Sequence, residues 1–198
     1  MSQIDFANST DLSSARLLGL CRKVAADWSV GRIKLQVRFS RGADFSGTCF
    51  YADRRILVNL GRHLRYPYKM GTLLARAKSY GRSWSKPVYS LEMQDGYEVA
   101  LFVFLHELYH LLIRKARRNT RQKESMCDRF AARYLVDHFA VLVRDEAGGL
   151  VARSEWDFQD VEGFVAAARR RRPPRAARAA RKPVPIDQPG EQMLLFPL

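Results

Sequence analysis

The stretch FLHELYHLLI, residues 104–113, places two histidines and a glutamate in an otherwise apolar run. From residue 98 to about residue 115 (98–115) the pattern is helical and almost wholly apolar, which predicts a central helix buried on most sides. Residues four apart lie on one face of a helix, so His106 and His110 can present two imidazoles to one ion. Glu107 lies beside them. This helix therefore decides both the fold and the chemistry that we expect.

These three residues form the HExxH pattern, which is typical of zinc hydrolases. Zn²⁺ held by His106 and His110 brings the pKa of a bound water to about 7. Glu107 accepts the proton of this water and later passes it to the leaving amine, while the metal helps to hold the oxyanion. The pattern thus predicts a zinc metalloendopeptidase with a protein substrate. The alternative is a chance pattern of histidines that are satisfied in the core.

A zinc site needs a third protein ligand, and residues 123–139 supply the candidates. At about 100° per residue, Glu124 and Asp128 share a helical face with residues of core type. Two carboxylates on such a face are costly unless a cation meets them. We predict Glu124 as the third ligand and Asp128 as the carboxylate that orients a ligand histidine through its other ring nitrogen. Two alternatives stay open, namely Asp128 on the zinc or two solvated carboxylates without a metal.

HELYH followed by ESMCDRFAARYL resembles the HExxH and E-x-x-x-N/D-x-F-A pattern of gluzincin metallopeptidases, especially those of the ImmA/IrrE type. The match covers roughly residues 99–140. The upstream order, IKLQVRFS, then GTCFYADRRILVNL, then the metal helix, is similar to the SprT/Spartan layout. SprT-like enzymes use a histidine as third ligand, but here the downstream His138 would lie about 20 Å along the axis from Glu124. The resemblance therefore implies a gluzincin-like metal site in a Spartan-like arrangement.

Two further helices flank this arrangement in the sequence. Asp11 or Ser13 can cap a helix that reaches about Trp28 and ends before Gly31. A second long helix, which carries the predicted carboxylates, runs from about residue 121 to residue 141 (121–141).

Strand patterns complete the prediction of an α+β domain, a minimal zincin that spans residues 1–168. IKLQVRFS, residues 33–40, alternates apolar and polar side chains, which is typical of a half-buried strand. Residues 47–60 continue as two short strands, so we expect a small antiparallel sheet. Residues 140–154 indicate a hairpin over two adjacent glycines, and residues 155–170 a last helix.

Composition indicates the partners. The chain of 198 residues has 34 Lys and Arg against 20 Asp and Glu, a net charge of +14, which favours polyanions such as nucleic acid. Cys21, Cys49 and Cys127 are odd in number and in no CxxC spacing, which predicts neither a disulfide framework nor a cysteine zinc site. We see no signal peptide, and the apolar run 99–105 is too short to span a bilayer. We expect no membrane and a cytoplasmic, nucleoid-associated protein.

Two basic segments predict contact with DNA. Residues 61–91, within a basic insertion 61–95, contain no acid and interleave cations with aromatic side chains, an arrangement suited to single-stranded nucleic acid. The alternative is a solvated basic loop. The second segment opens a Pro-rich region, 169–198, that we predict to be disordered. Its predicted DNA-binding residues are Arg169, Arg170, Arg171, Arg172, Arg175, Arg178, Arg181 and Lys182.

The last residues, EQMLLFPL, resemble the QLxLF peptide by which bacterial polymerases and repair proteins dock on the DNA polymerase sliding clamp. A flexible leash with apolar anchors at a free end suits such docking. The alternative is a hydrophobic tail that folds back on the domain. The residues that the resemblance assigns to the clamp are Gln192, Met193, Leu194, Leu195 and Phe196.

Together these features predict a zinc peptidase that acts on proteins at DNA, as in Spartan-like repair of DNA-protein crosslinks. Tethering raises the local concentration of substrate without a specificity pocket. Two other functions stay open: a regulatory protease of ImmA/IrrE type that cleaves a repressor, and a non-enzymatic DNA-binding protein with a structural zinc. Glu107 argues against the last, because a structural site needs no base.

Overall fold

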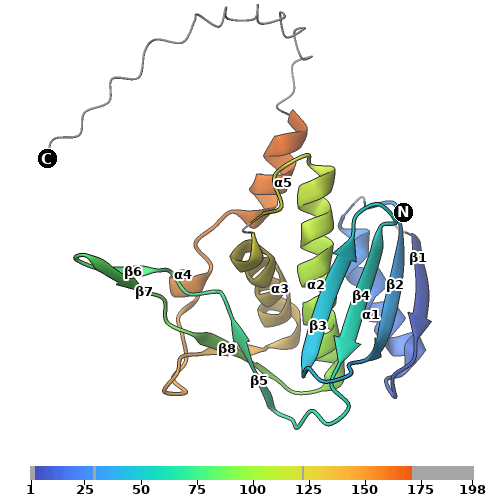
Figure 1. Ribbon diagram of the computed structural model, residues 1–198, viewed down its shortest axis with the longest axis horizontal. Coiled ribbons are helices and arrows are strands. Elements are labelled where there is room, and N and C mark those ends of the chain that lie inside the picture. The colour runs from blue at the N-terminus through green and yellow to red at the C-terminus, as the bar shows by residue number, and fades with distance from the viewer. Residues whose placement is uncertain (1–2, 29, 122, 171–198) are drawn as a thin grey trace, which may run out of the picture.

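The structure is a computed structural model that describes residues 3–28, 30–121 and 123–170, and it has the mixed α+β fold that the sequence predicts. Helix α2 (Gly96–Lys115) packs against helix α3 (Glu124–Phe139) on one side and against a four-stranded sheet on the other (Figure 1). Asp95 caps α2, its side chain accepting the Glu98 N–H at 3.0 Å. The expected central helix is therefore confirmed.

Helix α2 is nearly all buried. It is the one helix among the described residues whose length and hydropathy would suffice to cross a membrane, and 89% of that span is buried inside the protein. Such burial is typical of the core helix of a globular domain. Every polar group on α2 therefore either meets a partner from another element or loses hydration without compensation.

The four-stranded sheet has the order β1-β2-β4-β3. Strands β1 (Gln3–Asn8), β2 (Arg32–Phe39) and β4 (Arg55–Leu60) are parallel, and β3 (Phe45–Phe50) is the antiparallel edge strand. The two short strands that the sequence predicts, β3 and β4, pair antiparallel as expected, but the sheet as a whole is mixed because β2 pairs in parallel with both of its neighbours. Strand β1 lies outside the predicted set, and helix α1 (Ser14–Ala26) carries the chain across to β2 as a parallel crossover.

Helix α1 begins after Ser13, whose side chain accepts the Arg16 N–H, so one of the two predicted caps is confirmed. It packs against β1 and α2, which places α1 and α2 on the same face of the sheet (Figure 1). Buried and exposed residues alternate along β2, as predicted for a half-buried strand.

A second sheet occupies much of the predicted basic insertion. Its order is β5-β8-β9, with β5 (Tyr68–Thr72), β8 (Tyr89–Met93) and β9 (Leu142–Arg144) antiparallel. Between β5 and β8, the short strands β6 (Lys78–Tyr80) and β7 (Ser83–Ser85) form a hairpin that protrudes from the body (Figure 1). The insertion is thus part of the fold and not a simple loop.

Two elements near the end of the described chain differ from expectation. In place of the predicted hairpin of residues 140–154, the chain forms one isolated β-bridge, between Arg144 and Leu150. The strand β9 pairs with β8 instead. The predicted last helix is two helices, α4 (Arg153–Trp156) and α5 (Val161–Arg170).

The buried side chain of Arg129 explains the break between α4 and α5. Its guanidinium donates to the carbonyl of Trp156 and to the side chain of Gln159, so the linking segment is held on α3 rather than in a helix. It also donates to the carbonyls of Leu74, at 2.7 Å, and Ser125, at 3.0 Å. Arg129 is only 1% exposed, so these carbonyls depend on it.

We expect Arg129→Ala to lower the free energy of unfolding by about 3 kcal/mol or more, because it leaves several buried carbonyls without donors. Urea unfolding followed by circular dichroism measures the change. The exposed Arg22→Ala on α1 is the matched control and should change the free energy by about 0.5 kcal/mol or less. Equal effects of the two substitutions would contradict the structural role of Arg129.

Candidate metal centre

The candidate centre lies between two helices that pack side by side. Helix α2 contributes His106, Glu107 and His110 from its second half, and α3 contributes Glu124 and Asp128 from its first two turns. The structure therefore brings together all five residues that the sequence predicts for the centre. The role of Glu124 as a metal ligand stays a prediction.

Both imidazoles face one carboxylate. The Nε2 atom of His106 lies 3.1 Å from Oε2 of Glu124, and the Nε2 atom of His110 lies 3.4 Å from Oε1 of Glu124. The two rings are 5.0 Å apart between centroids. Two ring nitrogens and a bidentate carboxylate thus converge on one space between the helices.

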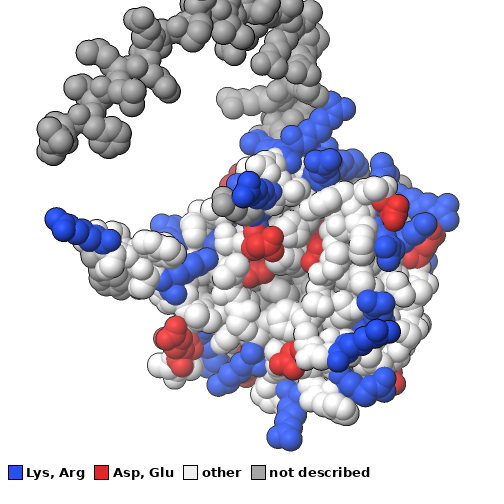
Figure 2. All heavy atoms as spheres, in the orientation of Figure 1, with Lys and Arg blue, Asp and Glu red and all other residues white. Residues whose placement is uncertain are grey.

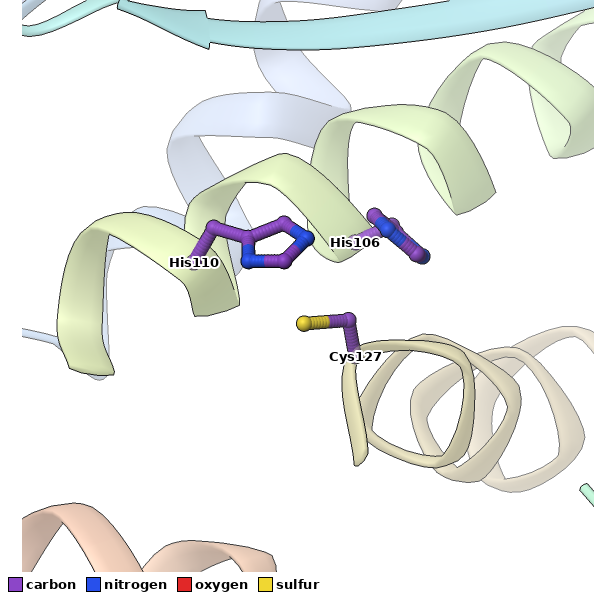
Figure 3. A group of neighbouring side chains, drawn as sticks. All are labelled: His106, His110 and Cys127. Carbon is purple, nitrogen blue, oxygen red and sulfur yellow. The ribbon is translucent and has the colours of Figure 1, made fainter. Parts of the chain in front are cut away.

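A thiol faces the same space. Ligand atoms of His106, His110 and Cys127 all lie within 4.8 Å of one another, close enough to hold one metal ion. Figure 3 shows the two rings and the Cys127 side chain directed toward the gap between α2 and α3. Burial and the neighbouring carboxylates raise the pKa of the Cys127 thiol well above its usual range.

Cys127 is the residue that the sequence prediction missed. The lack of paired cysteines argued against a cysteine metal site, whereas the structure brings a single thiol close enough to the two histidines to share an ion with them. The available signal was its spacing, since Cys127 follows Glu124 by three residues and so lies one helical turn further along. By contrast His138, at the other end of α3, packs on Tyr134 with ring centroids 4.3 Å apart.

Asp128 fixes the orientation of His106. Its Oδ1 lies 2.8 Å from Nδ1 of His106, and its Oδ2 accepts the backbone N–H of Leu73 at 2.7 Å. With Nδ1 engaged, His106 turns Nε2 toward Glu124. Burial lowers the pKa of His106, but Asp128 and the nearby glutamates outweigh it, so the pKa lies above its usual value.

His110 is held less completely. Burial and the neighbouring His106 lower the pKa of His110. Its Nδ1 is buried and has no hydrogen-bond partner among the described residues. The lower pKa favours a neutral ring, which is the form of histidine that binds a metal.

The Glu107 carboxylate lies against the edge strand β3. It accepts a hydrogen bond from the backbone N–H of Cys49, and burial raises its pKa to about 7. A Cβ atom at Gly47 would lie 2.7 Å from Cγ of Glu107 and 2.8 Å from Cγ1 of Val103. Only glycine at this position of β3 leaves room for the Glu107 side chain.

The predicted DNA-binding and clamp-binding residues belong mostly to the chain beyond the described part. Arg169 and Arg170 end helix α5. The remaining cations, from Arg171 to Lys182, and the peptide Gln192–Phe196 lie outside the described residues. The roles that we assigned to them from the sequence stay predictions.

Comparison of this chain with protein-family models, with curated proteins and with solved structures gives no match. Its function is therefore inferred from the geometry of the centre and from the chemistry of its side chains.

We expect Asp128→Ala to weaken Co²⁺ binding by about ten- to a hundredfold, because His106 loses the group that orients it. Glu124→Ala should weaken binding at least as much if Glu124 is a ligand. Titration with Co²⁺, followed by visible absorption, measures both. Asp53→Ala, which removes an exposed carboxylate from the turn between β3 and β4, should leave the affinity unchanged. Unaltered binding by Glu124→Ala would assign the third donor to Cys127 instead.

Proposed function

We propose that this chain is a zinc-dependent peptidase of the HExxH type that cleaves proteins held at DNA. The observation that carries the proposal is the position of Glu107. Its carboxylate lies beside His106, next to the metal-binding group and against the open edge strand β3. A general base must stand between a metal-bound water and the substrate, and a position beside His106 and against β3 would suit this role.

The donors suit zinc. Imidazole, carboxylate and thiol groups are the zinc ligands of proteins, whereas Mg²⁺ and Ca²⁺ prefer oxygen ligands alone. His106, His110 and Glu124 would hold the ion, with Asp128 behind His106. When bound, zinc supplies a water of lowered pKa and a positive charge for the oxyanion.

Glu107 performs the proton transfers in this proposal. Its carboxylate accepts a proton from the attacking water and later gives it to the amine of the departing peptide. The Cys49 N–H holds one side of the carboxylate, which limits its rotation. Burial raises the pKa of Glu107, which favours uptake of the proton of the water.

Strand β3 suits an extended peptide as substrate. It is the last strand of its sheet within the described residues, so its outer edge can pair with a further strand. Because Gly47 and Cys49 of β3 both contact or closely approach Glu107, a peptide that pairs with β3 would pass beside the base. Pairing through the main chain accepts many sequences, which suits a peptidase without a narrow specificity pocket.

The location at DNA is supported by charge and by the hairpin β6–β7. The chain carries a net charge of +14. Trp84 of the hairpin is 73% exposed, and Lys78 and Arg82 on the same hairpin are exposed. Figure 2 shows basic side chains on the protruding hairpin at the left of the molecule. An exposed indole between cations suits stacking on an unpaired base.

We expect Glu107→Gln to retain bound zinc and to lose proteolysis, because the amide cannot accept the proton of the water. Zinc content is measured on the purified protein and cleavage on an unfolded protein substrate, with and without DNA. Glu155→Gln, an exposed position on α4, is the control and should keep both properties. Loss of zinc from Glu107→Gln, or its continued activity, would contradict the assignment.

A second function is favoured by Cys127. A structural metal site uses four protein ligands and leaves no place for water, and His106, His110, Glu124 and Cys127 offer four donors. In that case the protein is a DNA-binding accessory whose metal stabilises the packing of α2 on α3.

Cys127→Ala separates the two functions. We expect the peptidase to retain zinc and activity in this variant, because three donors remain. The Co²⁺ form of the unaltered protein should then lack the sulfur-to-metal charge-transfer band that a bound thiolate produces. A structural site predicts the opposite outcome, with a charge-transfer band in the unaltered protein and loss of metal and of stability in Cys127→Ala.

A further inference from the structure

A cavity that contains no residue of the candidate metal centre lies at the carboxyl ends of strands β1, β2 and β4. Its volume is about 510 Å³. Residues that follow or end the three parallel strands line it, together with the start of β3. Ligands of sheets with parallel strands bind preferentially at this end, because the connecting loops diverge there.

Three arginines line the cavity without an acidic partner. Arg38 lies near the end of β2, Arg41 in the loop that follows, and Arg62 just after β4. None of them forms an ion pair with a carboxylate of the described residues. The nearby Asp44 carboxylate accepts the Tyr68 hydroxyl, at 3.0 Å, instead. The cavity therefore concentrates positive charge that nothing in the described chain neutralises.

Neutral groups hold two of these guanidinium groups in place. Nε of Arg38 donates to Oδ1 of Asn59 at 2.8 Å, and Nδ2 of Asn59 donates to Oγ of Ser46 at 2.8 Å. The guanidinium of Arg62 lies over the Phe39 ring, 4.1 Å from its centroid. These interactions orient the cations and leave their charge uncompensated, which is the requirement for a preformed anion site.

Hydroxyl groups add further donors. Oγ of Ser40 accepts the backbone N–H of Ala43 at 3.0 Å, and Oγ of Ser46 accepts from Asn59. Each hydroxyl hydrogen can therefore be donated to a ligand. Guanidinium and hydroxyl donors around one space match the several oxygens of a phosphate group.

The form of the cavity favours a phosphate in a polymer over a free nucleotide. The three arginines are all exposed, so a long chain can lie across the opening. The aromatic side chain of the lining, Phe39, is already covered by Arg62, which leaves it no role in stacking a base. Hydrogen bonds to phosphate groups alone hold nucleic acid without reading its sequence.

We propose that the cavity lined by Arg38, Arg41 and Arg62 binds the phosphodiester backbone of nucleic acid, independently of base sequence. This inference deepens the DNA part of the proposed function and involves no residue of the metal centre. It is tested by binding alone, so its failure leaves the peptidase proposal standing, and the failure of the peptidase proposal leaves this site standing.

The test compares two double variants of the full chain that lose the same charge. Arg41→Ala/Arg62→Ala removes two cations from the cavity, and Arg22→Ala/Lys23→Ala removes two exposed cations from α1. Binding of a fluorescein-labelled oligo(dT) is measured by anisotropy over a series of salt concentrations. Both variants keep the basic residues after α5, so those residues contribute equally.

For the cavity variant we expect an affinity about tenfold lower at low salt. The slope of log affinity against log salt should become less steep by about 1.4, at about 0.7 for each phosphate of a single strand that the protein no longer neutralises. The α1 variant should retain the slope of the unaltered protein. Equal slopes for the two variants would overturn the proposal, because net charge alone would then explain binding.

A second arm identifies the source of the phosphate group. Inorganic phosphate and thymidine monophosphate are added as competitors to the complex with oligo(dT). We expect displacement only at millimolar concentrations, because one phosphate forms a fraction of the interactions that the polymer forms. Displacement by micromolar amounts of either competitor would assign the cavity to a small ligand and overturn the proposal for nucleic acid.

Discussion

The carboxylate of Asp128 joins three parts of the chain that are distant in sequence. It bonds His106 of α2 through one oxygen and the N–H of Leu73, just after β5, through the other. A buried carboxylate is costly unless both oxygens are bonded, so α2, α3 and the end of β5 must meet in one arrangement. The orientation of His106 and the docking of the second sheet therefore depend on the same group.

The next residue extends this constraint. Arg129 donates to the carbonyl of Leu74 and to that of Trp156. Asp128 and Arg129 of α3 therefore bind the backbone of Leu73 and Leu74, the two residues that follow β5. Lys86, the residue that follows β7, donates to the carbonyl of Leu73 at 3.0 Å. Both ends of the protruding hairpin are thus anchored beside the metal centre.

Features with a local geometric origin could be predicted from the sequence. The four-residue spacing of His106 and His110, and the phase that puts Glu124 and Asp128 on one face, follow from the helix itself. The pairing of strands could not be predicted in this way, because the alternation along β2 does not determine which strands lie beside it. Strand β1 escaped prediction because it is short and carries only two large apolar side chains, Ile4 and Phe6, too few for a clear alternating pattern. The strands after β4 are short, between three and five residues, and carry little periodic signal.

The contacts of the Glu107 carboxylate help to distinguish a catalytic centre from a structural one. Cys127 would complete a closed site, but a closed site makes no use of a further carboxylate that can act as a base. Here β3 has glycine at position 47 where any side chain would collide with Glu107, and the Cys49 N–H bonds its carboxylate. Burial of a carboxylate that forms no ion pair is unfavourable. Buried carboxylates with a raised pKa are found preferentially at functional sites. The accommodation of Glu107 against the open edge of the sheet therefore supports the proposed peptidase, in which Cys127 would lie next to the metal without binding it.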